Sequence, residues 1–138
     1  MASYNKFNSF VEALAEKVHN LGSDTLTVAL CAAANAPVAG NSQLSNLTQI
    51  SYTNLSARTL TISASAQSSG TYKLTIADKT LTASGGAVAT FRYVVIYNDT
   101  ATNDELICWF DYGSDLTLAD GDTFTINFDD TNGLLQIA

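Results

Sequence analysis

"FRYVVIYNDTATNDELICWFDYG", residues 91–113, contains two apolar runs on either side of a polar, acidic turn. Six of the chain's thirteen aromatic side chains lie between Phe91 and Tyr112. A sheet strand with one solvated face alternates apolar and polar residues, and neither run follows that alternation closely. The stretch therefore predicts a central β-hairpin with two covered faces. One face meets the core, and the other meets the N-terminal helix, a long loop or another subunit.

The second face of this hairpin is a candidate contact surface. Aromatic residues are enriched at the centres of protein interfaces, and an exposed patch this rich is a liability on a free monomer. We therefore expect part of this face to contact another chain, while the chain's own helix is the alternative cover. The residues expected in that interface are Phe91, Tyr93, Tyr97, Ile107, Trp109 and Tyr112.

One amphipathic helix is predicted over residues 6–21, "KFNSFVEALAEKVHNL". Its apolar residues follow the spacing of a single helix face. Gly22 fits the left-handed position that commonly ends a helix. The apolar stripe consists of Phe7, Phe10, Val11, Leu14, Val18 and Leu21.

From Thr25 onward the period of the apolar residues changes to two, which is typical of β-strands. Segment 32–46 has turn composition, and its length suggests an excursion over the surface. Short strands with turns between them, and no β–helix–β alternation, favour a mainly β fold, an antiparallel β-sandwich of jelly-roll type. Besides the hairpin, strands are predicted within 25–31, 58–66, 71–77, 120–128 and the closing "LLQIA".

The length of 138 residues predicts a single domain over residues 1–138. Within it we expect the helix at about 6–21 and the β-sandwich at about 25–138. The hydrophobic fraction of 46% is typical of a globular protein and too high for a disordered one.

The charge of the chain is acidic and uneven. Thirteen acidic against six basic residues give a net charge of −7, and no Lys or Arg follows Arg92, whereas nine Asp or Glu residues do. Because phosphate contacts need Lys and Arg, this argues against nucleic-acid binding and against an anionic membrane surface. No stretch approaches the roughly 20 apolar residues of a membrane span, and a cleaved signal peptide is not expected.

The sequence carries no recognisable catalytic motif. His19 is the only histidine, and there is no G-x-S-x-G elbow, Walker-type loop or G-x-G-x-x-G. We predict that the protein is not an enzyme and has no cofactor and no metal site. The acidic turns at 98–105, 120–122 and 129–133 do not match a calcium loop, and Asp and Asn are also residues that turns favour.

Two further features leave alternatives open. Cys31 and Cys108 both lie in apolar runs and are expected to be buried free thiols, with a disulfide as the minor alternative. Trp109 with Tyr112 or Tyr97 could form a stacking platform, which keeps a carbohydrate- or receptor-binding β-sandwich as an alternative function.

Three phrases carry a resemblance to a known group of proteins. They are "YNKFNSFVEALAEKVHNLGSDTLTVAL" (4–30), "FRYVVIYNDTATNDELICWFDYGSDLTLADGDTFTINF" (91–128) and "NGLLQIA" (132–138). Together they resemble small virion proteins of tailed bacteriophages, and within that group the capsid cement, or decoration, proteins. The likeness extends from Tyr4 to the last residue and contains no diagnostic motif, so no individual functional residue is carried over.

The resemblance implies a non-enzymatic β-sandwich, often a jelly roll, on the exterior of an icosahedral capsid. Such a protein is made in the cytoplasm of the host bacterium and forms homodimers or homotrimers. It bridges neighbouring major capsid protein subunits and reinforces the shell against the pressure of the packaged DNA. A tail or head–tail joining structural protein is the alternative within the same group.

Overall fold

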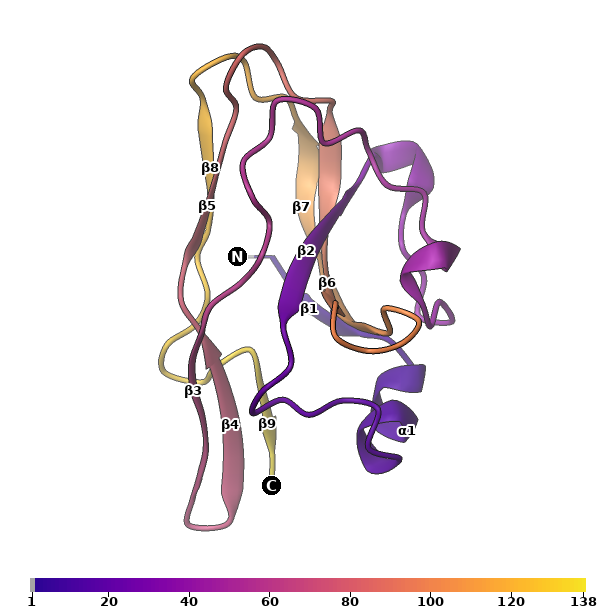
Figure 1. The fold of residues 1–138 in the computed structure, drawn as a ribbon, viewed down its shortest axis with the longest axis vertical. Helices are drawn as coiled ribbons and strands as arrows, with labels where there is room; N and C mark the ends of the chain where they lie inside the picture. Colours follow the sequence, from indigo (N-terminus) through magenta and orange to yellow (C-terminus); the bar gives the residue numbers. More distant parts are fainter. Residues whose placement is uncertain (1) are drawn as a thin grey trace.

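The predicted central hairpin forms the middle of a four-stranded antiparallel sheet (Figure 1). The computed structural model describes residues 2–138. In it β6 (Phe91–Asn98) pairs with β7 (Leu106–Leu116). Strand β2 (Leu26–Cys31) continues the sheet beyond β6, and β1 (Tyr4–Lys6) continues it beyond β7. The sheet order is therefore β1-β7-β6-β2, with the hairpin flanked on both sides.

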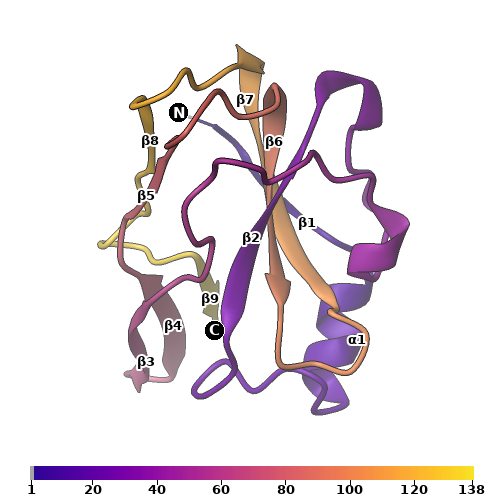
Figure 2. The same ribbon diagram turned by 45° about the horizontal axis from the view of Figure 1, so that its top comes forward.

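Two smaller antiparallel sheets make up a second layer. One has the order β3-β4-β9, with β3 (Ile62–Ser68), β4 (Thr71–Ile76) and β9 (Leu135–Ile137). The other pairs β5 (Lys79–Thr82) with β8 (Thr123–Ile126). Figures 1 and 2 show both small sheets on the same side of the four-stranded sheet. The prediction of a mainly β fold built from antiparallel strands is confirmed.

The main core lies between these two layers. Alternate residues of facing strands point into it, as expected for strands with period two. Removal of these apolar side chains from water is the main force that holds the two layers together. Its fully buried large members include Leu26, Val28, Leu30, Leu74, Ile76, Leu81, Phe91, Ile96 and Ile107.

The prediction of an amphipathic helix over 6–21 is wrong. Only α1 (Ser9–Ala15) is α-helical in this region, and residues 4–6 form β1 instead. The helix ends because Lys17, not Gly22, takes the left-handed conformation, with φ +68°. Val11, placed on the predicted apolar stripe, is 52% exposed. At the start of the predicted helix, Lys6 pairs with β7 and the Phe7 amide donates to the Ile107 carbonyl oxygen, so both residues follow the sheet rather than the helix.

The outer face of the four-stranded sheet is covered by the chain itself. A second group of apolar residues, here called the outer cluster, packs there beneath the segment that leads into α1 and the long loop after β2. That loop contains two short 3₁₀-helices, η1 (Ala33–Asn35) and η2 (Leu44–Asn46). The outer cluster consists of Phe7, Ala29, Cys31, Val95, Tyr97 and Leu106, with half-buried Leu44, Leu47, Tyr93 and Trp109.

Two irregularities in the hairpin change which side chains share a face. The pairing of β6 with β7 shifts between Phe91 and Tyr93, and again between Ile96 and Tyr97. At the first shift, Phe91 turns into the main core while Tyr93 joins the outer cluster. At the second, Ile107 has no partner on β6 and also turns into the main core. Such bulges reverse the inward and outward pattern that a regular strand would have.

One edge between the layers is closed by the chain. After η2 the long loop runs back along β2, where the Val28 amide donates to the Arg58 carbonyl oxygen and the Leu60 amide donates to the Leu26 carbonyl oxygen. This segment then crosses into β3 and the second layer (Figure 1). In the described part of the chain, no helix has the length and apolar character needed to cross a membrane.

Candidate functional site

The opposite edge, between β7 and β8, contains an apolar groove of about 350 Å³. Both layers supply its walls, and Ala2 and Tyr4 of the N-terminal segment also contribute to its lining. We call it the aromatic groove because five of its thirteen lining residues are aromatic. It is lined by Ala2, Tyr4, Val94, Phe110, Tyr112, Phe124, Thr125, Ile126, Asn127, Phe128, Asp129, Gly133 and Leu134.

The aromatic rings of the groove hold one another in edge-on contacts. Tyr4, opposite Phe110 in the pairing of β1 with β7, has its ring centroid 5.9 Å from that of Phe110. Across the groove, Tyr112 of β7 meets Phe124 of β8 at 5.7 Å with the rings nearly perpendicular. The Tyr112–Phe124 pair joins the two layers, whereas the Tyr4–Phe110 pair lies within the four-stranded sheet.

Two tyrosines leave a large part of their surface in solvent at the mouth of the groove. Tyr4 is 40% exposed and Tyr112 is 49% exposed, whereas Phe128 on the opposite wall is buried. Burial of part of the ring, together with the neighbouring Cys108, raises the pKa of the Tyr4 phenol, so this hydroxyl stays protonated. The mouth of the groove therefore presents two partly exposed tyrosine rings, and tyrosine is enriched at protein contact surfaces.

One fixed negative charge lies at the groove. The Asp129 carboxylate accepts hydrogen bonds from the backbone N–H groups of Thr131 and Asn132 and from the Asn132 side chain, all at 2.8 Å. These bonds hold the pKa of Asp129 below its usual range. The groove is therefore apolar along its walls and anionic at one end.

The six predicted interface residues do not form one surface. Phe91 and Ile107 are fully buried in the main core, and Phe91 packs against Phe124 at 5.5 Å between ring centroids. Both are therefore inaccessible to another chain in the folded protein. The expectation that they lie on an exposed face fails because each sits at a shift in the hairpin pairing.

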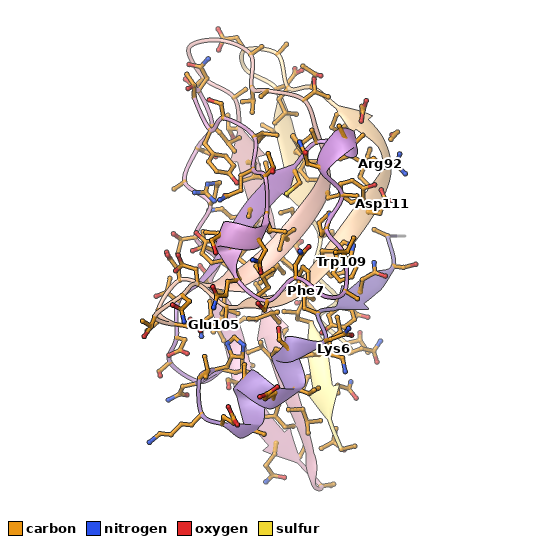
Figure 3. All side chains as sticks on the ribbon, turned by 90° about the vertical axis from the view of Figure 1, so that its right-hand side faces the viewer. Lys6, Phe7, Arg92, Glu105, Trp109 and Asp111 are labelled. Atoms are coloured by element: carbon orange, nitrogen blue, oxygen red, sulfur yellow. The ribbon has the colours of Figure 1, made fainter. Side chains whose placement is uncertain are left out.

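Three of the others lie on the outer face, beneath or beside the chain's own cover. Tyr97 is 4% exposed, while Tyr93 and Trp109 are half-buried in the outer cluster. Trp109 packs against Phe7 with the ring centroids 4.6 Å apart, and Figure 3 shows the two side chains together in the middle of this face. The Phe7 segment and the long loop after β2 thus cover the second face of the hairpin.

Tyr112 alone among the six belongs to the aromatic groove. Because Tyr112 contacts Phe124 of the second layer while Trp109 contacts Phe7 on the outer face, the two do not form a shared stacking platform. The other four aromatic side chains that line the groove were not among the predicted residues: Tyr4, Phe110, Phe124 and Phe128. The alternation in "TFTINF" pointed to Phe124 and Phe128 as a common face, but nothing in it showed that this face opens at an edge.

The rim of the outer face carries an ion pair. Arg92 contacts Asp111 through two hydrogen bonds of 2.8 and 3.0 Å, with both side chains about one-third exposed. The bond to Arg92 lowers the pKa of Asp111, aided by the Gly113 amide. Figure 3 shows this pair near one margin of the sheet, away from Phe7 and Trp109. An exposed pair of this kind adds little to stability.

The acidic turns use their carboxylates as caps for the backbone. Asp120 accepts a hydrogen bond from the Gly85 amide at 2.9 Å, and Asp122 accepts one from the Ala119 amide at 3.0 Å. Among residues 2–138, no three His, Cys, Asp or Glu side chains gather as a metal-binding group would. The turn interpretation of these acids is the one that the contacts support.

Cys31 and Cys108 are both buried free thiols, as predicted. Burial raises the pKa of the Cys31 thiol to about 11 and raises that of Cys108 as well. Both side chains therefore act as small apolar residues at neutral pH, one in each hydrophobic cluster.

No protein-family model, no curated protein and no solved structure matches this chain. The aromatic groove is therefore assigned on its geometry and chemistry alone.

Proposed function

We propose that this protein is a structural virion protein that decorates an icosahedral phage capsid by bridging major capsid protein subunits. The observation that carries the proposal is the aromatic groove, an apolar site that spans both layers and displays Tyr4 and Tyr112. Partly exposed aromatic rings around an apolar recess are typical of sites that bind another protein. The resemblance to capsid decoration proteins supplies the class of partner.

The proposal includes the assembly and the place of the protein. It forms a homodimer or homotrimer on the capsid exterior, and its β-layers belong to a jelly-roll sandwich. Each copy needs to bury only modest area, because many symmetric copies that each touch several subunits add their weak contacts together. The net charge of −7 keeps such a crowded surface layer soluble.

The first test is the location of the protein in the virion. Heads and tails are separated on a density gradient, and the protein is quantified in each fraction by mass spectrometry. We expect it in tail-free heads. Recovery with isolated tails would instead support the tail or head–tail joining alternative, and its absence from the virion would overturn both.

The second test asks whether the groove makes the contact. Purified Tyr112→Asp protein and heads that lack the protein are mixed and sedimented together. We expect the buried carboxylate to abolish co-sedimentation, because an apolar contact does not compensate its desolvation. Val38→Asp is the matched control, since Val38 is 57% exposed and lies outside the groove lining. Equal binding of the two folded variants would show that the groove is not the contact.

A further inference from the structure

The single histidine of the chain is built into a buried hydrogen-bond network. His19 follows α1 and is 4% exposed, with its ring tilted against Phe10 at 5.3 Å between centroids. Its Nδ1 atom lies 3.0 Å from the side-chain nitrogen of Asn98, the last residue of β6. This contact joins the region after α1 to the far end of the central hairpin.

The remaining bonds of Asn98 determine which nitrogen of His19 carries the proton. The Asn98 side-chain oxygen accepts the backbone N–H groups of Thr100 and Ala101, at 3.0 and 3.2 Å. Its nitrogen donates to the Asp24 carboxylate at 2.7 Å. The amide orientation is thus fixed, with NH₂ toward the ring, so Nδ1 of His19 must accept a hydrogen bond and the proton must sit on Nε2.

A protonated His19 does not fit this network. Protonation places a hydrogen on Nδ1, directly opposite the Asn98 NH₂ group, so that two donors face each other. Asn98 has no simple way to turn, because rotation of its amide breaks the two backbone bonds and the bond to Asp24. The Nε2 atom is also buried, and no residue from 2 to 138 is its hydrogen-bond partner, so a charged ring gains nothing on that side.

The charged groups around the imidazole ring offset only part of the cost of protonating His19. Asp24, in the turn before β2, and Glu105, in the turn before β7, both favour the charged imidazole, whereas burial disfavours it and is the larger influence. Phe10 is the neighbour on α1 and carries no charge. Burial therefore lowers the pKa of His19 below its usual value of about 6.5.

We propose that His19 is a proton-operated lock, which ties the region after α1 to the β6–β7 turn while its imidazole is neutral and releases this end of the protein when the imidazole is protonated. The unfolded segment takes up its proton near pH 6.5, and the folded one only at lower pH. The stabilising contribution is therefore complete above pH 6.5 and is lost as the pH falls through the folded-state pKa. We expect only the region after α1 and the β6–β7 turn to open, because His19, Asn98 and Asp24 lie outside the main core.

Hydrogen exchange at single amides tests the lock. The amides of Thr100 and Ala101 report on it directly, and the Leu134 amide, bonded to the Leu74 carbonyl oxygen in the second layer, is the internal control. After correction for intrinsic rates, we expect Thr100 and Ala101 to lose up to about tenfold protection between pH 7.5 and 5.5, the limit for uptake of one proton. Leu134 should keep its protection over the same range.

A variant and a spectroscopic measurement complete the test. His19→Gln supplies a carbonyl oxygen to accept from Asn98 and does not titrate, so its Thr100 and Ala101 amides should lose the pH response. If they keep the response of the wild type, the lock is overturned. Nitrogen-15 spectra of the wild-type imidazole test the proposal even if the variant does not fold, because they report which ring nitrogen is protonated. Nδ1 should be unprotonated at pH 7.5, and a protonated Nδ1, or a ring pKa at or above 6.5, would contradict the proposal.

Discussion

Gly133 occupies a position where a side chain does not fit. Its φ is +75°, and a Cβ atom would lie 2.5 Å from the backbone oxygen of Leu74. That oxygen already accepts the Leu134 amide at 2.7 Å, so it is not free to move away. The residue thus allows the turn after Asp129 to approach β4 closely before β9 begins.

We expect Gly133→Ala to lower the free energy of unfolding by roughly 2–3 kcal/mol, through left-handed strain plus the steric clash. Gly70→Ala is the matched control, since Gly70 has φ +85° but a Cβ atom added there would meet nothing within 4 Å. It should cost only about 1–2 kcal/mol, the strain alone. Urea unfolding of both variants gives the comparison, and equal losses would show that the close approach to Leu74 does not matter.

The two thiols should be inert in the folded protein. Burial raises the pKa of Cys31 to about 11 and raises that of Cys108, so neither is ionised to a useful extent at pH 8. We expect an aromatic disulfide reagent to release almost no colour from native protein and about two equivalents per chain in denaturant. Rapid reaction of one equivalent in the native state would mean that one cysteine is exposed.

Among the loops, the segment between β2 and β3 is bonded to the sheet by backbone groups and also by one tyrosine side chain. The Tyr52 hydroxyl accepts the Leu30 amide at 3.0 Å and donates to the Gln49 side chain at 2.6 Å. The Arg58 guanidinium stacks 3.7 Å from the centre of its ring. These contacts fasten the loop to the free edge of β2, where it acts in place of a further strand.

Tyr52→Phe should lower the free energy of unfolding by roughly 1–3 kcal/mol, because the Leu30 amide loses its partner. The Leu30 amide should also exchange faster, which separates this effect from a general loss of stability. Tyr93→Phe is a suitable control, since no hydrogen bond of the Tyr93 hydroxyl occurs within the described residues. A Leu30 amide as protected as in the wild type would contradict the proposed anchor.

The sequence predicted the strands better than it predicted their faces. The two apolar runs around a polar turn were enough to place β6 and β7, and the alternation in "TYKLTIA" was enough to place β4. It was not enough to reveal the shifts at Phe91 and Ile107, because a bulge leaves no mark in a pattern of apolar residues. The helix was predicted too long for a different reason. Lys6 and Phe7 bond to β7 and Lys17 takes a left-handed conformation, and a pattern of apolar residues records neither feature.

For the protein as a whole, the candidate site arises where two layers meet, and this is why the sequence identified so little of it. Tyr4 and Phe128 are separated by most of the chain, and only the sheet order brings them to one edge. The outer face, which the sequence singled out as a contact surface, is instead occupied by Phe7 and the long loop. The surplus apolar residues of the hairpin thus belong to the outer cluster within the chain. The exposed apolar surface is instead the aromatic groove between β7 and β8.

Association between copies should respond to salt in a definite direction. Each chain carries −7, and the part of the chain after Arg92, which supplies most of the groove lining, contains no Lys or Arg. If copies meet through the apolar groove, their like charges repel, and screening by salt weakens that repulsion. We therefore expect sedimentation velocity to show stronger self-association at 0.5 M than at 0.05 M salt, values that correspond to Debye lengths of roughly 4 and 14 Å.

Tyr112→Asp should abolish the association at both salt concentrations, whereas Val38→Asp should behave as the wild type. Oligomers that dissociate as salt is added would show instead that the contact is held by opposite charges and that copies do not meet through the groove.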